Sequence, residues 1–161
     1  MATACLVSLF GCAQKEATAF NKEGLEDVMV TKENQPIAFT EILKKYEGKT
    51  IVIDVWASWC PDCIKGMAKV KSLQAKYPEA TYLFISMDKT YDAWLKGIEK
   101  YDVKGEHYLT ADGMKGVFGK SIDFDWIPRY MVINQKSGIA KYYAIVPDDP
   151  EIQKTIDELS K

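Results

Sequence analysis

The stretch TIVIDVWASWCPDC, residues 50–63, is the most informative segment for the fold of this chain. Its first half is an almost continuous apolar run rich in β-branched residues, which is typical of a strand covered on both faces. Its second half places Cys60 and Cys63 at the spacing CxxC directly after that strand. Such a pair is a redox couple, half of a metal site or two ordinary buried thiols, and the rest of the chain has to decide between them.

The segment from Pro61 to Tyr77 has the period of an amphipathic helix. Its apolar residues are spaced by four, three, three and four positions: Cys63, Met67, Val70, Leu73 and Tyr77. Proline suits the first turn of a helix, where no N–H is needed. Cys60 is thus expected at the helix N-terminus and Cys63 one turn inside, so that the two sulfurs can close a disulfide. We expect the first sulfur to be exposed and the second shielded.

The remaining elements alternate between helix and strand. Further helices are expected at residues 39–46, 90–101, 113–119 and from 149 onward, and further strands at residues 81–88, 106–109, 129–134 and 139–146. The first two long strands should be parallel, whereas the last two, joined by QKSG, should form an antiparallel hairpin. The fold class is therefore α/β, with a central mixed β-sheet flanked by helices. The cysteine pair lies at the carboxyl end of a central strand, where open α/β sheets bind ligands.

Composition and charge indicate a single globular domain and argue against some classes of function. The chain has 161 residues, of which 47% are hydrophobic and 27% charged, and this indicates one globular domain with a substantial core. The formal net charge is -2, and no long block of Lys or Arg occurs. Nothing therefore favours a nucleic-acid partner.

The N-terminal residues indicate a route out of the cytoplasm. Residues 1–11 carry no charge and read as a signal peptide, and the stretch from Leu9 to Cys12 resembles a bacterial lipobox. Cys12 is then the lipidation site, residues 12–30 form a flexible tether, and residues 31–161 form the domain. A membrane-anchored lipoprotein of the cell envelope is expected, with a secreted or cytoplasmic protein as the alternative. Loss of residues 1–11 together with lipidation of Cys12 would leave Cys60 and Cys63 as the only free thiols.

The expected position of Cys60 at a helix N-terminus lowers the free energy needed to ionise its thiol. A free thiol with a pKa of about 8.5 is only about 3% ionised at pH 7, and half ionisation requires about 2 kcal/mol. The helix dipole contributes about 0.3 to 1 kcal/mol, and one or two N–H bonds to the sulfur supply the remainder at about 1.5 to 3 kcal/mol each. Asp62 opposes the thiolate, and Lys65 offsets part of that effect.

Asp54 is an acidic residue inside the apolar run of residues 50–57. Burial of an anion is costly, so the pKa of this carboxyl group should be raised. Because Asp54 lies on the strand that delivers the cysteines, it could take the proton from Cys63 during disulfide exchange. The alternative is a carboxylate satisfied by a nearby polar group, and the sequence leaves both open.

These residues together resemble a known superfamily. Asp54 precedes Cys60 by six residues, and Trp59 stands directly before that cysteine. Pro128 follows an apolar residue ahead of the hairpin strands. This combination resembles the thioredoxin superfamily over residues 31–161, and the tether with the Trp-Ala-Ser-Trp-Cys-Pro context resembles its membrane-anchored TlpA/ResA-like branch. The resemblance implies a thioredoxin-like fold.

The resemblance also implies a function and its residues. The chain is expected to be a thiol-disulfide oxidoreductase, in the direction of a reductase, with Cys60 as nucleophile, Cys63 as resolving cysteine and Asp54 as buried proton acceptor. Substrate-binding positions are implied at Trp59, Pro61, Ile127 and the cis-proline Pro128. Implied partners are protein disulfides of the envelope and a membrane thiol-transfer protein as electron donor. The cysteine pair is the redox centre, so neither an organic cofactor nor a metal is expected.

Other readings carry less weight. A structural zinc site needs about four ligands, but the chain has one histidine, His107, and no second CxxC. His107 is expected to be a surface or strand residue, and Asp123 with Asp125 a solvated loop. Two functional alternatives remain: a tethered non-catalytic thioredoxin-like interaction module, and a peroxiredoxin-like peroxide reductase that uses one reactive cysteine.

Overall fold

The computed structural model describes residues 17–110 and 112–161. The predicted signal peptide and the predicted lipidation site Cys12 lie outside these residues. No helix in the described part is both long enough and apolar enough to cross a bilayer.

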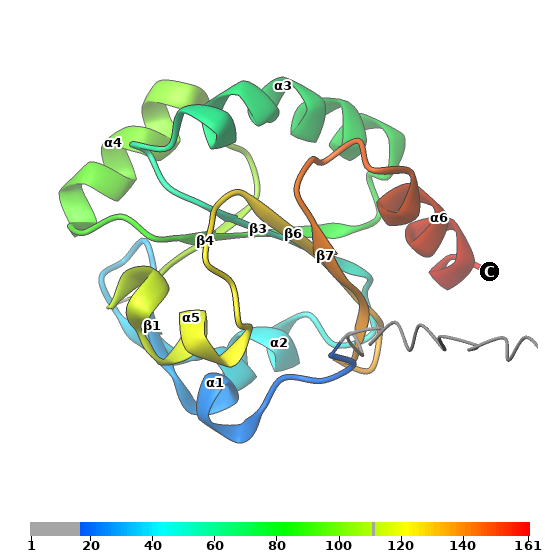
Figure 1. The fold of residues 1–161 in the computed structure, drawn as a ribbon, viewed down its shortest axis with the longest axis horizontal. Helices are drawn as coiled ribbons and strands as arrows, with labels where there is room; N and C mark the ends of the chain where they lie inside the picture. The colour runs from blue at the N-terminus through cyan, green and yellow to red at the C-terminus, as the bar shows by residue number, and fades with distance from the viewer. Residues whose placement is uncertain (1–16, 111) are drawn as a thin grey trace, which may run out of the picture.

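A seven-stranded mixed sheet forms the middle layer (Figure 1), in the order β2-β1-β5-β4-β3-β6-β7. The strands are β1 (Val28–Val30), β2 (Pro36–Ala38), β3 (Ile51–Trp56), β4 (Thr81–Ser86), β5 (Glu106–Thr110), β6 (Arg129–Ile133) and β7 (Ile139–Ala144). β3 pairs in parallel with β4 and antiparallel with β6, and β6 and β7 form the antiparallel hairpin. The expected sheet is thereby confirmed.

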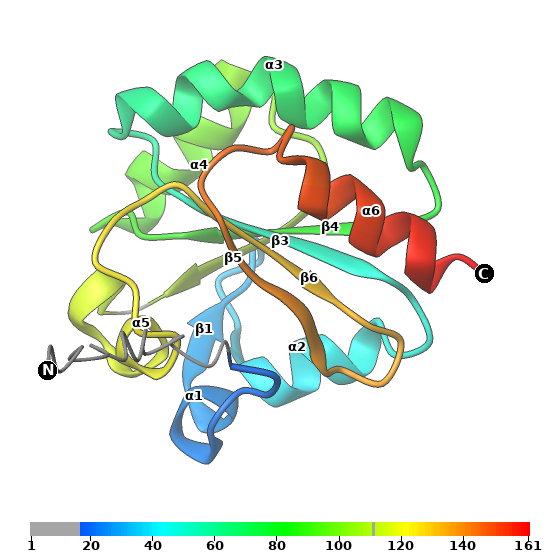
Figure 2. The same ribbon diagram turned by 45° about the vertical axis from the view of Figure 1, so that its right-hand side comes forward.

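Helices cover both faces of the sheet. Figures 1 and 2 show α3, α4 and α6 on one face and α1, α2 and α5 on the other. The helices are α1 (Lys22–Glu26), α2 (Phe39–Lys45), α3 (Pro61–Lys76), α4 (Tyr91–Tyr101), α5 (Val117–Ser121) and α6 (Pro150–Leu159), with a 3-10 turn at Gly113–Lys115. The single helix expected at residues 113–119 is thus two short elements.

β3 lies at the centre because its sequence has no polar face to expose. All six of its residues are buried, as the continuous apolar run predicts. Helices cover it on both sides, and its neighbours β4 and β6 satisfy its backbone on both edges. The strand that leads to the cysteine pair is therefore held by the most buried part of the molecule.

The folded domain begins earlier than the sequence pattern indicates. Residues 12–30 were predicted to be a tether, but Phe20 is buried and Met29 is fully buried in the core. α1 occupies part of this segment, and β1 pairs with both β2 and β5. A three-residue strand with one inward side chain leaves no periodicity to recognise, so the boundary at residue 31 was wrong.

His107 is a strand residue, as expected, but it is not at the surface. It lies in β5 with 4% of its area exposed and stacks on the Phe84 ring at 5.2 Å between centroids. Its Nε2 lies 3.0 Å from the carbonyl oxygen of Val103. Burial lowers the pKa of the imidazole to about 4, so His107 is a neutral core side chain at neutral pH.

The acidic pair before Pro128 lies in an exposed loop, as predicted. Asp123 and Asp125 are both exposed, and Asp125 forms an ion pair with Arg129 at 3.2 Å. In residues 17–110 and 112–161, no three His, Cys, Asp or Glu side chains gather in an arrangement suited to a metal ion.

Candidate active site

The cysteine pair sits where β3 passes into α3. Cys60 is the N-cap of α3, and Pro61 occupies the first helical position. The backbone N–H of Cys63 donates to Cys60 Sγ at 3.1 Å. The first turn of the helix thus directs an N–H that has no partner within the helix at the sulfur, and this stabilises negative charge on the sulfur.

The two sulfurs form a disulfide across the first helical turn. The Cα atoms of Cys60 and Cys63 are 5.3 Å apart, as the CxxC spacing predicts. Cys63 is fully buried, and Cys60 is only 4% exposed. The second cysteine is shielded as expected, but the expectation that the first is exposed was wrong, because Cys60 is buried as well.

Part of that cover comes from a distant segment of the chain. The peptide bond between Ile127 and Pro128 is cis, as the resemblance implies, and the carbonyl oxygen of Ile127 lies 3.8 Å from Cys60 Sγ. Both residues are buried. The fold therefore brings the cysteine pair and the cis-proline together across 67 positions of sequence.

The two tryptophans near the cysteines have different roles. Trp56 is fully buried on β3 and packs in the core. Trp59 is 52% exposed directly beside Cys60, and Pro61 is exposed as well. Trp59 and Pro61 thus form an accessible apolar rim on one side of the disulfide.

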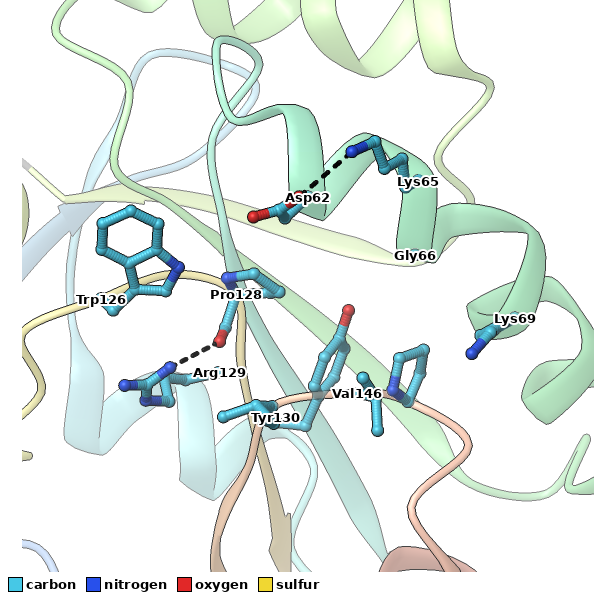
Figure 3. Close-up of a pocket in the computed structure, with 11 residues that line it drawn as sticks. Asp62, Lys65, Gly66, Lys69, Trp126, Pro128, Arg129, Tyr130 and Val146 are labelled. Carbon is cyan, nitrogen blue, oxygen red and sulfur yellow. Dashed lines mark hydrogen bonds and ion pairs between the residues drawn. The ribbon is translucent and has the colours of Figure 1, made fainter.

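A groove of about 530 Å³ opens on the other side of Pro128 (Figure 3). One wall is formed by residues of α3 and another by the loop between β7 and α6. Its lining residues are Asp62, Lys65, Gly66, Lys69, Trp126, Pro128, Arg129, Tyr130, Ile145, Val146 and Pro147. Trp126, Ile145 and Val146 are exposed apolar residues that sequence reasoning missed. Trp126 lies in the loop before Pro128, and Ile145 and Val146, which were expected in the last strand, follow the end of β7 at Ala144.

Hydrogen bonds to the Asp88 carboxylate hold the loop between β3 and α3 in place. The carboxylate of Asp88 accepts from the Ser58 N–H at 3.0 Å and from the Ser58 hydroxyl at 2.6 Å. It also accepts from the Ser86 hydroxyl at 2.8 Å, and Asp88 is buried. Asp88 follows β4, the parallel neighbour of β3, and so fixes the segment that leads into Cys60. No local sequence pattern indicates this role.

Replacement of Gly97 by alanine is expected to disturb this loop. A Cβ at Gly97 on α4 would lie 2.4 Å from Ser58 Cβ, too close without a shift of the loop or of α4. Alanine is intrinsically favoured over glycine in a helix by about 1 kcal/mol, yet overpacking costs about 1 to 3 kcal/mol. We expect a net loss in the free energy of unfolding, measured by urea denaturation. Lys96→Ala, an exposed change on the same helix, should leave that energy unchanged within about 0.5 kcal/mol.

Asp54 is buried on the face of the sheet that α3 covers. The hydroxyl of Tyr82 donates to the carbonyl oxygen of Leu73 on α3, so Tyr82 points to that helix. Val52 is the register partner of Tyr82, and Asp54 follows it by two residues on the same face. Asp54 therefore lies beneath α3, whose sheet-facing side carries Cys63.

The Asp54 carboxyl group has no polar partner in the described part of the chain. The residue is 3% exposed, and neither oxygen has a hydrogen-bond partner there. Burial raises its pKa well above the usual value. The alternative reading, a carboxylate satisfied by a polar neighbour, does not describe this structure.

The charged residues of the first turn lie at the surface. Asp62 and Lys65 are both exposed and form an ion pair at 3.5 Å. The pair is solvated, so each charge acts weakly on the sulfurs.

Comparison with known proteins agrees with this geometry. The model of the Redoxin family matches residues 33–159. The thiol-disulfide oxidoreductase ResA of Bacillus cereus is 31% identical over 94 residues, which cover 57% of this chain and 52% of ResA. The soluble secreted antigen MPT53 of Mycobacterium bovis is 23% identical over 155 residues, 96% of this chain and 83% of MPT53. This chain thus aligns with only about half the length of ResA.

A solved structure supports the same assignment. The solution structure of a putative thiol-disulfide oxidoreductase from Bacteroides vulgatus superposes with a TM-score of 0.71 at 25% identity, covering 87% of this chain and 90% of the other. The likeness extends over most of both chains and therefore over the central sheet and its helices. The chain belongs to the Redoxin family of the thioredoxin superfamily, in its ResA/TlpA-like branch.

Proposed function

We propose that this protein is a thiol-disulfide oxidoreductase that exchanges disulfides with other proteins. The observation that carries the proposal is the disulfide between Cys60 and Cys63 at the start of α3, with the carbonyl oxygen of Ile127 3.8 Å from Cys60 Sγ. Such a pair stores two electrons, so the reaction needs no organic cofactor or metal. The named activity of the ResA relative agrees with this reading.

The reaction proceeds in two exchanges. In the reduced enzyme, the Cys60 thiolate attacks one sulfur of a substrate disulfide, that bond breaks, and one substrate thiolate leaves. Cys63 then attacks Cys60 Sγ in the mixed disulfide and releases the second substrate thiol. The substrate gains two electrons and two protons, and the enzyme ends with the disulfide between Cys60 and Cys63.

The roles of the two cysteines follow from their positions. Cys60 is at the helix N-terminus, where its sulfur accepts the Cys63 N–H, and it lies beside the exposed Trp59. Cys63 is fully buried in the core, and its sulfur is bonded to that of Cys60. Cys60 is therefore the nucleophile and Cys63 the resolving thiol.

Asp54 serves the second exchange. A buried thiol has a raised pKa and needs a base to form its thiolate. Asp54 lies beneath α3 and has no polar partner among the described residues, and burial raises its pKa, which makes its carboxylate a stronger base than an exposed one. It accepts the Cys63 proton when the mixed disulfide is resolved.

Substrate binds along the cis-proline. The backbone of Ile127 lies beside Cys60 and offers its polar groups to an extended segment that carries the substrate cysteine. Trp59, Pro61 and Pro128 supply apolar contacts around that segment. Such a site would recognise the backbone of a substrate and would not require one particular substrate sequence.

We propose that the enzyme works as a reductase in the cell envelope. Stabilisation of its thiolate is modest, because the Cys63 N–H donates to the sulfur while the exposed pair of Asp62 and Lys65 adds little. A poorly stabilised thiolate makes the dithiol a better electron donor. A membrane thiol-transfer protein then re-reduces the enzyme, Cys12 carries the lipid anchor, and the secreted relative MPT53 fits an extracytoplasmic location.

The reduction potential tests the function and its direction. We would equilibrate the chain from residue 13 to 161 in thiol buffers, quench with acid, and count alkylated Cys60 and Cys63 by mass spectrometry. A reductase should show a two-electron potential near or below about -230 mV, whereas about -120 to -180 mV would assign an oxidase or isomerase. Absence of a reversible couple would favour the tethered interaction module.

A further inference from the structure

The sheet register places Asp54 in a row with two very different neighbours. On β4 its partner is Phe84, an apolar residue, and on β6 its partner is Tyr130. Directly opposed residues of an antiparallel pair share a face, with Cβ atoms about 4.5 to 5.5 Å apart. Of the two cross-strand neighbours, Tyr130 alone carries a polar group toward α3.

The Tyr130 hydroxyl is buried and without a partner. The residue is 1% exposed, and its Oη has no hydrogen-bond partner among the described residues. A buried hydroxyl without a partner costs free energy, and a protein retains one more readily where it serves a function. Asp54, on the adjacent strand, has the same unsatisfied state.

Gly66 on α3 leaves room for this hydroxyl. Figure 3 shows the Tyr130 hydroxyl directed toward α3 near Gly66. A Cβ at Gly66 would lie 3.1 Å from Tyr130 Oη, so any larger residue would crowd it. The Tyr130 ring also lines the groove beside Pro128. Its hydroxyl thus lies between the buried sheet face and a groove that opens to the surface.

The Tyr130 hydroxyl and the Asp54 carboxyl group are not hydrogen-bonded to each other in the structure. From their juxtaposition we infer that the Tyr130 hydroxyl becomes the hydrogen-bond donor that stabilises the Asp54 carboxylate once Asp54 has given up its proton. Tyr130 is then a positioning residue for the proton transfer proposed above, and the inference rests on that proposed function. Tyr130 stays a neutral donor throughout, because burial, and next to it the charge of Asp54, raise the pKa of its phenol above the usual value.

The other charged and titratable groups around the pair do not replace this contact. α3 contributes the resolving thiol Cys63 and also Lys69, which is paired with Asp148 at 2.8 Å. Asp148, in the loop before α6, repels negative charge on Tyr130. Arg129 and the pair of Asp62 with Lys65 line the outer part of the groove.

One rival donor lies on the same face. Trp56 is fully buried on β3, two residues after Asp54, and its Nε1 also has no partner among the described residues. Residues two apart on one strand are separated by about 6.6 Å, more than a directly opposed cross-strand pair. The register therefore favours Tyr130 over Trp56.

The test is the titration of Asp54 in three variants of the full chain. The carboxyl carbon of Asp54 would be followed by NMR with labelled aspartate, assigned through Asp54→Asn. Tyr130→Phe removes only the hydroxyl and should raise the pKa of Asp54 by about one unit or more, a tenfold change in its ionisation constant. Tyr82→Phe is the matched control, because its hydroxyl bonds a helix carbonyl and should leave Asp54 unchanged.

Two results would overturn the inference. One is a pKa of Asp54 that is the same in Tyr130→Phe as in the Tyr82→Phe control. The other is a rise in Trp56→Phe and none in Tyr130→Phe, which would assign the donor to the indole.

Kinetics separate this inference from the proposed function. Resolution of the Cys60 mixed disulfide should shift its pH profile upward in Tyr130→Phe, and this shift should vanish in an Asp54→Asn background. If the wild-type chain exchanges no disulfides while the pKa of Asp54 still shifts in Tyr130→Phe, the proposed function is wrong and the contact between Tyr130 and Asp54 is supported. If the wild-type chain exchanges disulfides but neither the pKa nor the pH profile shifts in Tyr130→Phe, the proposed contact is wrong and the proposed function is supported.

Discussion

Replacement of Cys60 by serine is expected to abolish disulfide exchange. The hydroxyl of serine is barely ionised at neutral pH, and the Cys63 N–H directed at Sγ cannot overcome that difference. The second-order rate constant for reduction of a disulfide-bonded protein should fall by about three orders of magnitude or more. The measurement is the loss of the substrate disulfide in the presence of excess dithiol.

Cys63→Ser is the matched control for this prediction. It removes the same number of sulfur atoms but keeps the nucleophile at the helix N-terminus. The first exchange should therefore proceed, and the mixed disulfide through Cys60 should accumulate as a covalent adduct, visible on non-reducing gels. The pair of variants separates nucleophile from resolving thiol.

Other results for the two serine variants would favour a different function. Equal turnover in Cys60→Ser and wild type would remove Cys60 from catalysis and favour an interaction module that binds partners without reducing them. Peroxide consumption that survives Cys63→Ser would instead favour the peroxide reductase, which needs one reactive cysteine.

Replacement of Asp54 by asparagine is expected to slow resolution. An amide cannot accept the proton of Cys63, so the buried thiol stays protonated for longer in the mixed disulfide. General base catalysis contributes about 10² to 10⁴-fold, and a loss in the lower part of that range is expected. Quenched-flow trapping of the Cys60 adduct measures this step. Attack by Cys60 itself should change little, and a resolution rate equal to wild type would remove Asp54 from the mechanism.

The same substitution should stabilise the protein at neutral pH. Burial raises the pKa of Asp54, so the folded chain holds a proton that the unfolded chain releases above about pH 4. The folded state then binds more protons, and its stability falls as pH rises toward the folded pKa. Asparagine removes this dependence, because it does not titrate.

The gain should be about 1 kcal/mol or more near pH 7, since each unit of pKa difference corresponds to about 1.4 kcal/mol. Below about pH 4 the carboxyl group is neutral in both states, and the gain should vanish. Urea denaturation of both proteins across this range measures it. A difference between the two proteins that did not vary with pH would show that Asp54 titrates alike in the folded and unfolded chain.

The fold around β3 and α3 follows from local sequence. The apolar run of residues 50–57 and the helical period from Pro61 depend on neighbours within a few positions, so burial and periodicity identify them directly. The same holds for the cap at Thr90, which accepts from the Ala93 N–H, and for Asp149 before α6. α1 and β1 were missed because a short helix and a three-residue strand carry too few inward side chains.

In the candidate site, too, some residues could be predicted from the sequence and others could not. Cys60, Cys63 and Asp54 were identified from sequence because one strand and one helix turn place all three. Their surroundings depend on contacts between distant segments: the Ile127 carbonyl beside Cys60, the Asp88 carboxylate beneath Ser58 and the Gly97 contact with that loop. Such contacts depend on strand register and helix packing, which no local period encodes.

Local sequence specifies the reactive pair, its place at a helix N-terminus and the buried acid that precedes it, because spacing within one strand and one turn is a local property. The residue that faces this acid depends instead on how distant segments pack. The antiparallel register of β3 and β6 places Tyr130, and no other polar cross-strand neighbour, beside Asp54. Residues 76 positions apart become partners through sheet pairing, and pairing is chosen by the packing of the whole core.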